Sequence, residues 1–204
     1  MAQRSLLDYC LPPRKLNPAA VLQFLYSEDS MGKYLKTGWR DVTPELQQFI
    51  YSGLQENEKN TQRPSSKISQ RMGELSGDIM WSVREVEFTH SVILWHVATE
   101  VVFHDDNHRY RALLDPYCRI IKALSDYMMY LFSLYPAMLP AGIGHIRLRD
   151  TCTEAMNFTL NNVQFKEAVR GLFGVDIRSR SFLIQMGSSR KSAFFEGCGI
   201  ANHL

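Results

Sequence analysis

The chain has 204 residues, of which 45% are hydrophobic and 22% charged, and its formal net charge is +2. This length accommodates one domain with a sizeable core, and the composition is typical of a globular protein rather than a disordered one. The small net charge, without a Lys or Arg run longer than two, argues against a nucleic acid partner. Four widely spaced cysteines and an N-terminus without an apolar signal run indicate an intracellular protein with reduced thiols.

The first part of the chain, residues 1–55, is predicted to be an N-terminal helical segment. A short helix is expected at Gln3–Cys10, ahead of the pair Pro12-Pro13. A second helix is predicted to begin at Thr43-Pro44-Glu45, where a capping hydroxyl precedes a proline and an acid in the first turn. That helix should run over about residues 44–56. Its spacing predicts that it buries four apolar side chains: Leu46, Phe49, Ile50 and Leu54.

Residues 56–69 are polar and are predicted to form a flexible linker or loop. The main helical domain, 70–204, follows it. Its longest helical pattern runs from about Val83 to Phe103 and carries apolar residues around most of its circumference, so this helix should be central in the core. The residues predicted to share its main face are Val83, Val86, His90, Ile93, Leu94, Val97 and Val101.

The next helix is predicted to begin at Asp115-Pro116 and to end near Tyr135, because Pro136 follows. An apolar loop rich in Pro and Gly comes next. Further helices are expected at about Asp150–Phe158 and Ser192–Leu204. Together these elements predict an all-α fold, an irregular multi-helix domain with a central apolar helix and a Pro/Gly-rich apolar loop.

The stretch Tyr127–Ile146 contains no Asp, Glu, Lys or Arg over twenty residues. Pro136 disfavours a continuous membrane-spanning helix. Two interpretations stay open: a helix in a soluble core covered by a kinked loop, or a segment at a membrane interface. The side chains that would contact the membrane are Tyr127, Tyr130, Tyr135, Arg147 and Arg149.

The most distinctive polar pattern is His96-x3-Glu100-x3-His104, which places three side chains on one stripe of the central helix. His96 and His104 are two turns apart, about 12 Å along the axis, so they cannot bind one metal ion together. The pattern therefore favours a buried Glu100 held by histidines, and no metal or cofactor is predicted. The alternative is a metal site drawn from His96, Glu100, His104, Asp105, Asp106 and His108.

Two further patterns have features of a functional site. Arg190 and Lys191 precede a helical stretch and are candidates for a weak anion site, but Arg190 occupies the position where a phosphate loop requires glycine. No pairing of a nucleophile with a base is specified by the sequence, so no catalytic residue is predicted.

Several segments closely resemble a plant family, the domain of unknown function 594. They are Ser5–Leu11, Leu94–Glu100, Leu124–Leu131, Met138–Cys152 and Gly187–Cys198. The resemblance implies a C-terminal helical domain that follows a multi-spanning membrane region and faces the cytosol, without catalytic residues to carry over. It also implies that this chain is truncated at both ends, with an incomplete C-terminus. Tyr135 stands where the family pattern leads us to expect an arginine.

These observations lead to one main functional hypothesis and two alternatives. The main one is a non-enzymatic helical interaction module of a membrane-associated plant family, whose apolar grooves accept a protein partner or a missing family helix. A membrane surface is a further candidate partner, although the chain has no clear transmembrane helix of its own. The alternatives are a metal-dependent protein or enzyme built on the histidine and acid cluster of the central helix, and a fragment without independent function.

Overall fold

The computed structural model describes residues 1–6, 37–59, 79–104, 115–135, 144–160 and 192–203. In these residues, helices dominate and the only strands are two residues each, which confirms the all-α prediction. The elements, in chain order, are β1 (Ala2–Gln3), β2 (Gly38–Trp39), α4 (Pro44–Lys59), α6 (Trp81–Arg84), α7 (Phe88–His104), α9 (Pro116–Leu134), α10 (Gly144–Leu160) and α13 (Ala193–Ala201).

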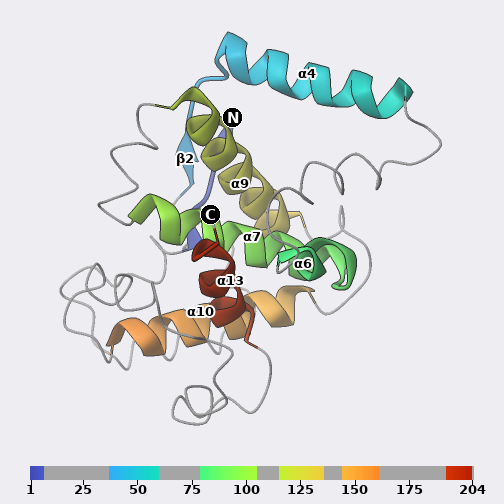
Figure 1. Ribbon diagram of the computed structural model, residues 1–204. Helices are drawn as coiled ribbons and strands as arrows, with labels where there is room; N and C mark the ends of the chain where they lie inside the picture. Colours follow the sequence, from blue (N-terminus) through green and yellow to red (C-terminus); the bar gives the residue numbers. More distant parts are fainter. Residues whose placement is uncertain (7–36, 60–78, 105–114, 136–143, 161–191, 204) are drawn as a thin grey trace.

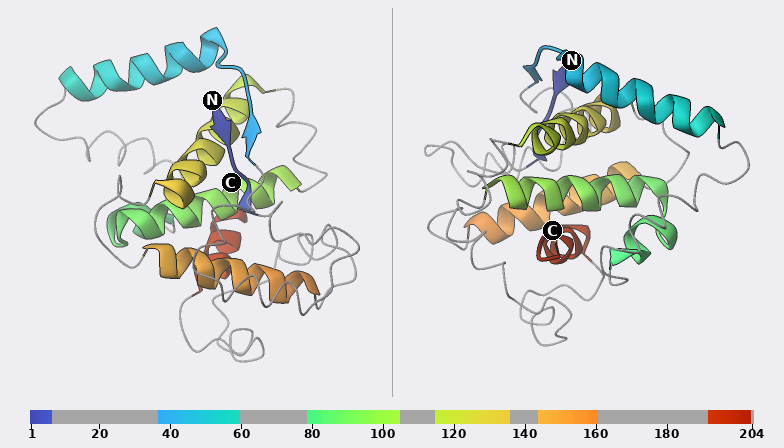
Figure 2. Two further views of the ribbon diagram at one scale, coloured as in Figure 1. Left: turned by 180° about the vertical axis from the view of Figure 1, so that it is seen from behind. Right: turned by 45° about the horizontal axis from the view of Figure 1, so that its top comes forward.

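The central element is α7, as predicted. It lies between α9 on one side and the pair α10 and α13 on the other (Figures 1 and 2). Ile93, Leu94, Val97 and Ala98 are fully buried, because neighbours cover this helix on several sides. The predicted start at Val83 is wrong. The short helix α6 ends at Arg84 and α7 begins at Phe88, which leaves Val83 exposed.

Both predicted ends of α9 are confirmed. The Asp115 side chain accepts a hydrogen bond of 2.8 Å from the Tyr117 backbone N–H, and Pro116 occupies the first position. At the other end, the Tyr135 N–H donates to the Leu131 carbonyl. The inner face of α9 consists of Ile120, Ala123, Asp126, Met129 and Phe132.

The last helix, α13, lies directly on α7. A Cβ atom at Gly197 would be 2.7 Å from the Val97 Cβ, so only glycine permits this close approach. Ser192 caps the helix by accepting a hydrogen bond from the Phe195 N–H, as the predicted start at Ser192 requires. The almost wholly buried α13 therefore completes the core beside α7.

The predicted helix at Gln3–Cys10 is wrong at its start, because β1 pairs antiparallel with β2. The extended backbone is held along α9: the Gln3 side chain donates to the Ala123 carbonyl, and the Arg4 N–H donates to the Asp126 carbonyl. These long-range hydrogen bonds outweigh the local helical pattern. Residues 7–10 of the predicted helix lie outside the described residues.

The predicted start of the fourth long helix at Asp150 is also wrong, because α10 begins at Gly144. Gly144 lies against α9, where a Cβ atom would be 3.1 Å from the Phe132 ring. The last part of the predicted Pro/Gly-rich loop is thus helical. The earlier part, residues 136–143, lies outside the described residues.

The helix α4 begins with the predicted Thr43 cap, whose hydroxyl accepts from the Leu46 N–H at 3.3 Å. The prediction that α4 buries four apolar residues is wrong. Leu46 is buried against Ile120 and Ala123 of α9, whereas the other three, Phe49, Ile50 and Leu54, are exposed. The reason is its position: α4 lies at the edge of the molecule beyond α9 (Figure 1).

The helix α4 ends at Lys59, and thus includes the first residues of the predicted linker 56–69. The remainder of that linker lies outside the described residues, so the division into segments 1–55 and 70–204 stays a prediction. Within the described residues, no helix is both long and apolar enough to cross a bilayer.

Candidate functional site

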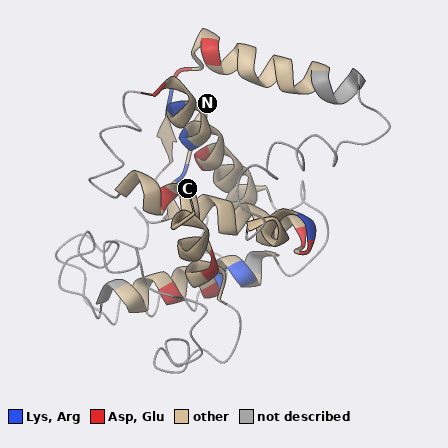
Figure 3. Cartoon of the chain, in the orientation of Figure 1, with Lys and Arg blue, Asp and Glu red and all other residues tan. Residues whose placement is uncertain are grey.

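The stripe predicted on α7 forms a ladder around one buried acid. The Glu100 carboxylate lies between the two histidines, with Oε1 3.7 Å from His96 Nε2 and Oε2 3.4 Å from His104 Nε2. His96 and Glu100 are buried, whereas His104 is partly exposed at the end of the helix. Glu100 is the only Asp, Glu, Lys or Arg residue in α7 (Figure 3).

The cation that balances this acid comes from α9. Lys122 Nζ lies 2.8 Å from Glu100 Oε1 and 2.6 Å from Asp126 Oδ1. One ammonium group therefore binds two carboxylates from two different helices. We call this set, completed by His96 and His104, the Lys122 network. Its hydrogen bonds join α7 to α9 inside the core.

His96 connects the network to the N-terminal segment. The Leu6 backbone N–H donates to His96 Nε2 at 3.1 Å, and His96 Nδ1 lies 2.9 Å from Ser125 Oγ. Because Nε2 accepts, the proton of the neutral imidazole is on Nδ1, which donates to the Ser125 hydroxyl. Burial lowers the pKa of His96 to about 4; Glu100 opposes this shift and Lys122 adds to it.

The acids of the network differ in their affinity for a proton. Burial raises the pKa of Asp126 to about 7, and the nearby Glu100 adds to this shift while Lys122 opposes it. Burial would also raise the pKa of Glu100, but its 3.4 Å contact with His104 and the charge of Lys122 together lower it. Glu100 is therefore the permanent anion, and Asp126 titrates near neutral pH.

The pair Ser125 and His96 has the separation of a nucleophile and its base, which the sequence did not reveal. Its hydrogen-bond directions give it a different role. The Nδ1 proton points at the serine and Nε2 is taken by Leu6, so His96 has no free lone pair to accept the serine proton. With a pKa of about 4, it is also a weak base at neutral pH. The pair is a structural contact between α7 and α9.

Three side chains of the network also have the donor types of a metal site. One ligand atom each of His96, Glu100 and Asp126 lies within 4.8 Å of the others. However, His96 Nε2 accepts from Leu6, and both carboxylates bind Lys122. The ammonium group occupies the position of a cation, so a metal ion would have to displace it. The other predicted ligands, Asp105, Asp106 and His108, lie outside the described residues.

Arg147, predicted as a membrane contact, joins a second polar cluster inside the fold. His90 of α7 lies between Arg147 of α10, 3.5 Å from its Nδ1, and Glu196 of α13, 3.3 Å from its Nε2. Arg147 is half-buried. This cluster links three helices, as the Lys122 network links two.

The other predicted membrane-contact residues lie on α9 and α10. Tyr127 and Tyr130 are half-buried and stack on each other with ring centroids 6.3 Å apart, and Tyr135 is exposed at the end of α9. Arg149 is half-buried. The candidate anion-binding residues Arg190 and Lys191 lie outside the described residues; the adjacent Ser192 caps α13 and donates to Glu154.

Sequence reasoning identified His96, Glu100 and His104 but missed Lys122 and Asp126. The signal was present: Asp126 interrupts the apolar stripe of α9, and Lys122 precedes it by one turn. In comparisons with family models, curated proteins and solved structures, nothing matches this chain.

Proposed function

We propose that this chain is a non-enzymatic interaction module that binds an amphipathic helix of a partner protein through the exposed face of α4. The observation that carries the proposal is an apolar stripe that begins inside the fold and continues out of it. The stripe consists of Leu46, Phe49, Ile50, Gly53 and Leu54.

The residues of the stripe have the spacing of a helix face that packs against another helix. Its members follow one another at i, i+3, i+4, i+7 and i+8, which places them on one side of the helix. Leu46 uses this side to anchor α4 on α9. Phe49 is 44% and Leu54 63% exposed. Further along α4, therefore, none of the described residues covers this side of the helix. A contiguous exposed apolar face of this kind is typical of a protein-binding surface.

Gly53 adds a second argument. It lies in the middle of α4, where glycine costs about 1 kcal/mol relative to alanine. A Cβ atom there would meet nothing within 4 Å, so packing against the described residues does not require glycine. Close approach of a second helix would require it, as Gly197 shows between α13 and α7.

The setting of the module is part of the proposal. The resemblance of Leu94–Glu100 and Met138–Cys152 to the plant family supports a position at the cytosolic face of a membrane, tethered through the spans of that family. A partner helix at the same membrane is then at high local concentration, so a modest affinity is sufficient.

The test places a photo-crosslinking amino acid at position 54, on the stripe, or at position 48, on the opposite and exposed face of α4. In plant cells we expect one discrete protein adduct from position 54 and none from position 48. The adduct should disappear when Phe49→Glu is added, while a Ser52→Glu control on the polar face keeps it. Equal adducts from both faces, or none from a folded protein, would overturn the proposal.

A further inference from the structure

We propose that the hollow between the start of α4 and the start of α9 binds an amphiphilic organic anion, with a carboxylate or phosphate head between Arg40 and Arg119 and an alkyl chain on the apolar floor. This site uses residues other than the exposed stripe of α4. The proposal therefore goes beyond the binding of a partner helix and does not depend on it.

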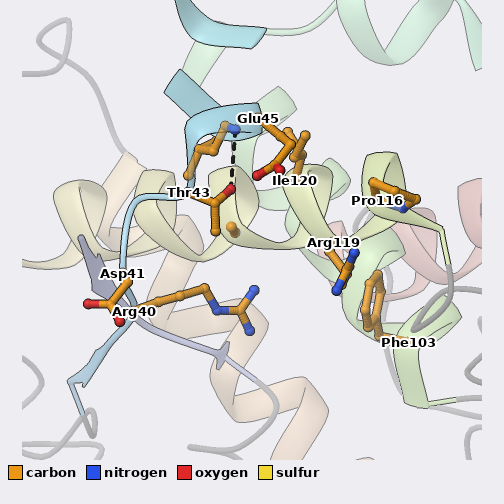
Figure 4. A pocket seen from close by; sticks show the side chains of 10 residues that line it. Arg40, Asp41, Thr43, Glu45, Phe103, Pro116, Arg119 and Ile120 are labelled. Atoms are coloured by element: carbon orange, nitrogen blue, oxygen red, sulfur yellow. Dashed lines mark hydrogen bonds between the residues drawn. The ribbon is translucent and has the colours of Figure 1, made fainter. Parts of the chain in front are cut away.

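The hollow has the size and lining of a small-molecule site. Its volume is about 500 Å³, inside the usual range of roughly 300–1,000 Å³ for ligand pockets. Three separate parts of the chain form it: the segment from β2 into α4, the end of α7, and the first turns of α9 (Figure 4). Its apolar lining consists of Leu46, Phe103, Pro116, Ile120 and Ala123.

Two arginine side chains from different parts of the chain extend into this hollow. The guanidinium groups of Arg40, which precedes α4, and Arg119, on α9, point toward the same space in Figure 4. Within the part of the chain that the structure describes, neither group has a hydrogen bond or an ion pair. Guanidinium groups bind carboxylate and phosphate oxygens in a fork geometry, so the two define where an anionic head lies.

Two acids also line the hollow, but they do not occupy the space between the arginines. Hydrogen bonds from its own backbone N–H and from Thr43 lower the pKa of Glu45, and the charge of Arg119 makes a smaller contribution in the same direction. The Glu45 carboxylate therefore mainly serves the first turn of α4. Asp41 directs its carboxylate away from Arg119 (Figure 4). Within the described residues, neither carboxylate forms a hydrogen bond or an ion pair with Arg40 or Arg119, so both guanidinium groups can bind an incoming anion.

The ligand chemistry follows from this arrangement. A small inorganic anion would leave the apolar floor exposed to water, and a neutral hydrocarbon would leave both guanidinium groups unused. An alkyl chain with a charged head satisfies both. The source is either a free single-chain amphiphile or a membrane lipid whose head and first methylenes enter the hollow.

The test measures binding of dodecyl phosphate to the full chain by calorimetry, below its micelle concentration. We expect Arg40→Gln and Arg119→Gln each to weaken binding about tenfold or more, which corresponds to about 1.4 kcal/mol. Arg84→Gln, which removes the same charge on α6, should leave it unchanged. Inorganic phosphate and a neutral dodecyl glycoside should each bind at least about tenfold more weakly.

Flotation with vesicles that contain phosphatidic acid separates the two sources. If the protein floats with the vesicles, and if Arg119→Gln or added dodecyl phosphate abolishes this flotation, the ligand is a membrane lipid. If the protein binds dodecyl phosphate but does not float with the vesicles, the ligand is a free amphiphile. Both results support the site. Dodecyl phosphate that fails to bind, or that binds equally to both arginine variants and the wild type, would overturn the proposal. Leu54→Glu, which disrupts the exposed stripe of α4, should bind dodecyl phosphate as the wild type does. A failure of the anion site can therefore be distinguished from a failure of the proposed partner-helix surface.

Discussion

Asp126 and His96 respond to pH in opposite directions, and this gives a sharp test of the Lys122 network. Folding raises the pKa of Asp126 from 3.8 to about 7, so its contribution to stability is full at low pH and is lost as the pH rises through 7. Folding lowers the pKa of His96 from 6.5 to about 4, so its contribution is full above pH 6.5 and is lost as the pH falls. Each effect changes the free energy of unfolding by about 1.4 kcal/mol per pH unit, and the two cancel between roughly pH 4.5 and 6.

Replacing Asp126 with Asn removes one of these two effects and keeps the shape of the side chain. The free energy of unfolding of Asp126→Asn, relative to the wild type, should therefore rise by about 2 kcal/mol between pH 4.5 and pH 6.0. This follows from about 1.4 kcal/mol per pH unit acting over 1.5 pH units. Urea unfolding followed by tryptophan fluorescence at several pH values measures it, because the groups common to both proteins cancel in the difference.

The control is Glu85→Gln, which removes an exposed carboxylate between α6 and α7. Its curve of stability against pH should run parallel to that of the wild type. A parallel curve for Asp126→Asn as well would show that the folded protein does not hold a proton on Asp126, and the description of the network would be wrong.

Three further variants test the packing around the core. Lys122→Met leaves the permanent anion Glu100 buried without its ammonium group and should cost about 3–5 kcal/mol in urea unfolding at pH 7. Adding Glu100→Gln should recover part of this loss, and an unchanged midpoint for Lys122→Met would contradict the buried pairing. Gly53→Ala should stabilise the isolated protein by about 1 kcal/mol, seen as a higher melting temperature, because the site is open. The same exchange at Gly197 should lower the melting temperature, because the new Cβ atom would clash with Val97; equal effects at the two glycines would refute the close packing of α13 on α7.

The parts of the fold that the sequence predicted correctly depend on local chemistry. The ends of α9 follow from Asp115-Pro116 and Pro136, and the start of α4 follows from Thr43, because caps and prolines act within one turn. The burial of Phe49 and Leu54 was predicted wrongly from the same kind of pattern. Helical spacing shows which residues share a face, but whether a neighbour covers that face depends on tertiary contacts far away in the sequence.

The contacts of the candidate site also fall into those that a local sequence pattern predicts and those that it does not. The ladder of His96, Glu100 and His104 was visible because its members are i, i+4 neighbours on one helix. The contact of His96 with the Leu6 N–H joins residues 90 positions apart, and only the extended N-terminal segment makes it. The hydrogen bond that fixes the tautomer, and with it the chemical role of His96, therefore has no signal in the local pattern.

Lys122 could have been found by an argument from charge balance rather than from periodicity. Glu100 is the single charged residue of an apolar central helix, and Asp126 lies on the inner face of α9. Two acids buried between neighbouring helices require a cation, because an unpaired buried charge costs several kcal/mol. On α9, Arg119 lies two turns before Asp126, whereas Lys122 lies one turn before it, within reach of both carboxylates. The buried acids thus select Lys122 as their partner and leave Arg119 free to face the hollow beside α4.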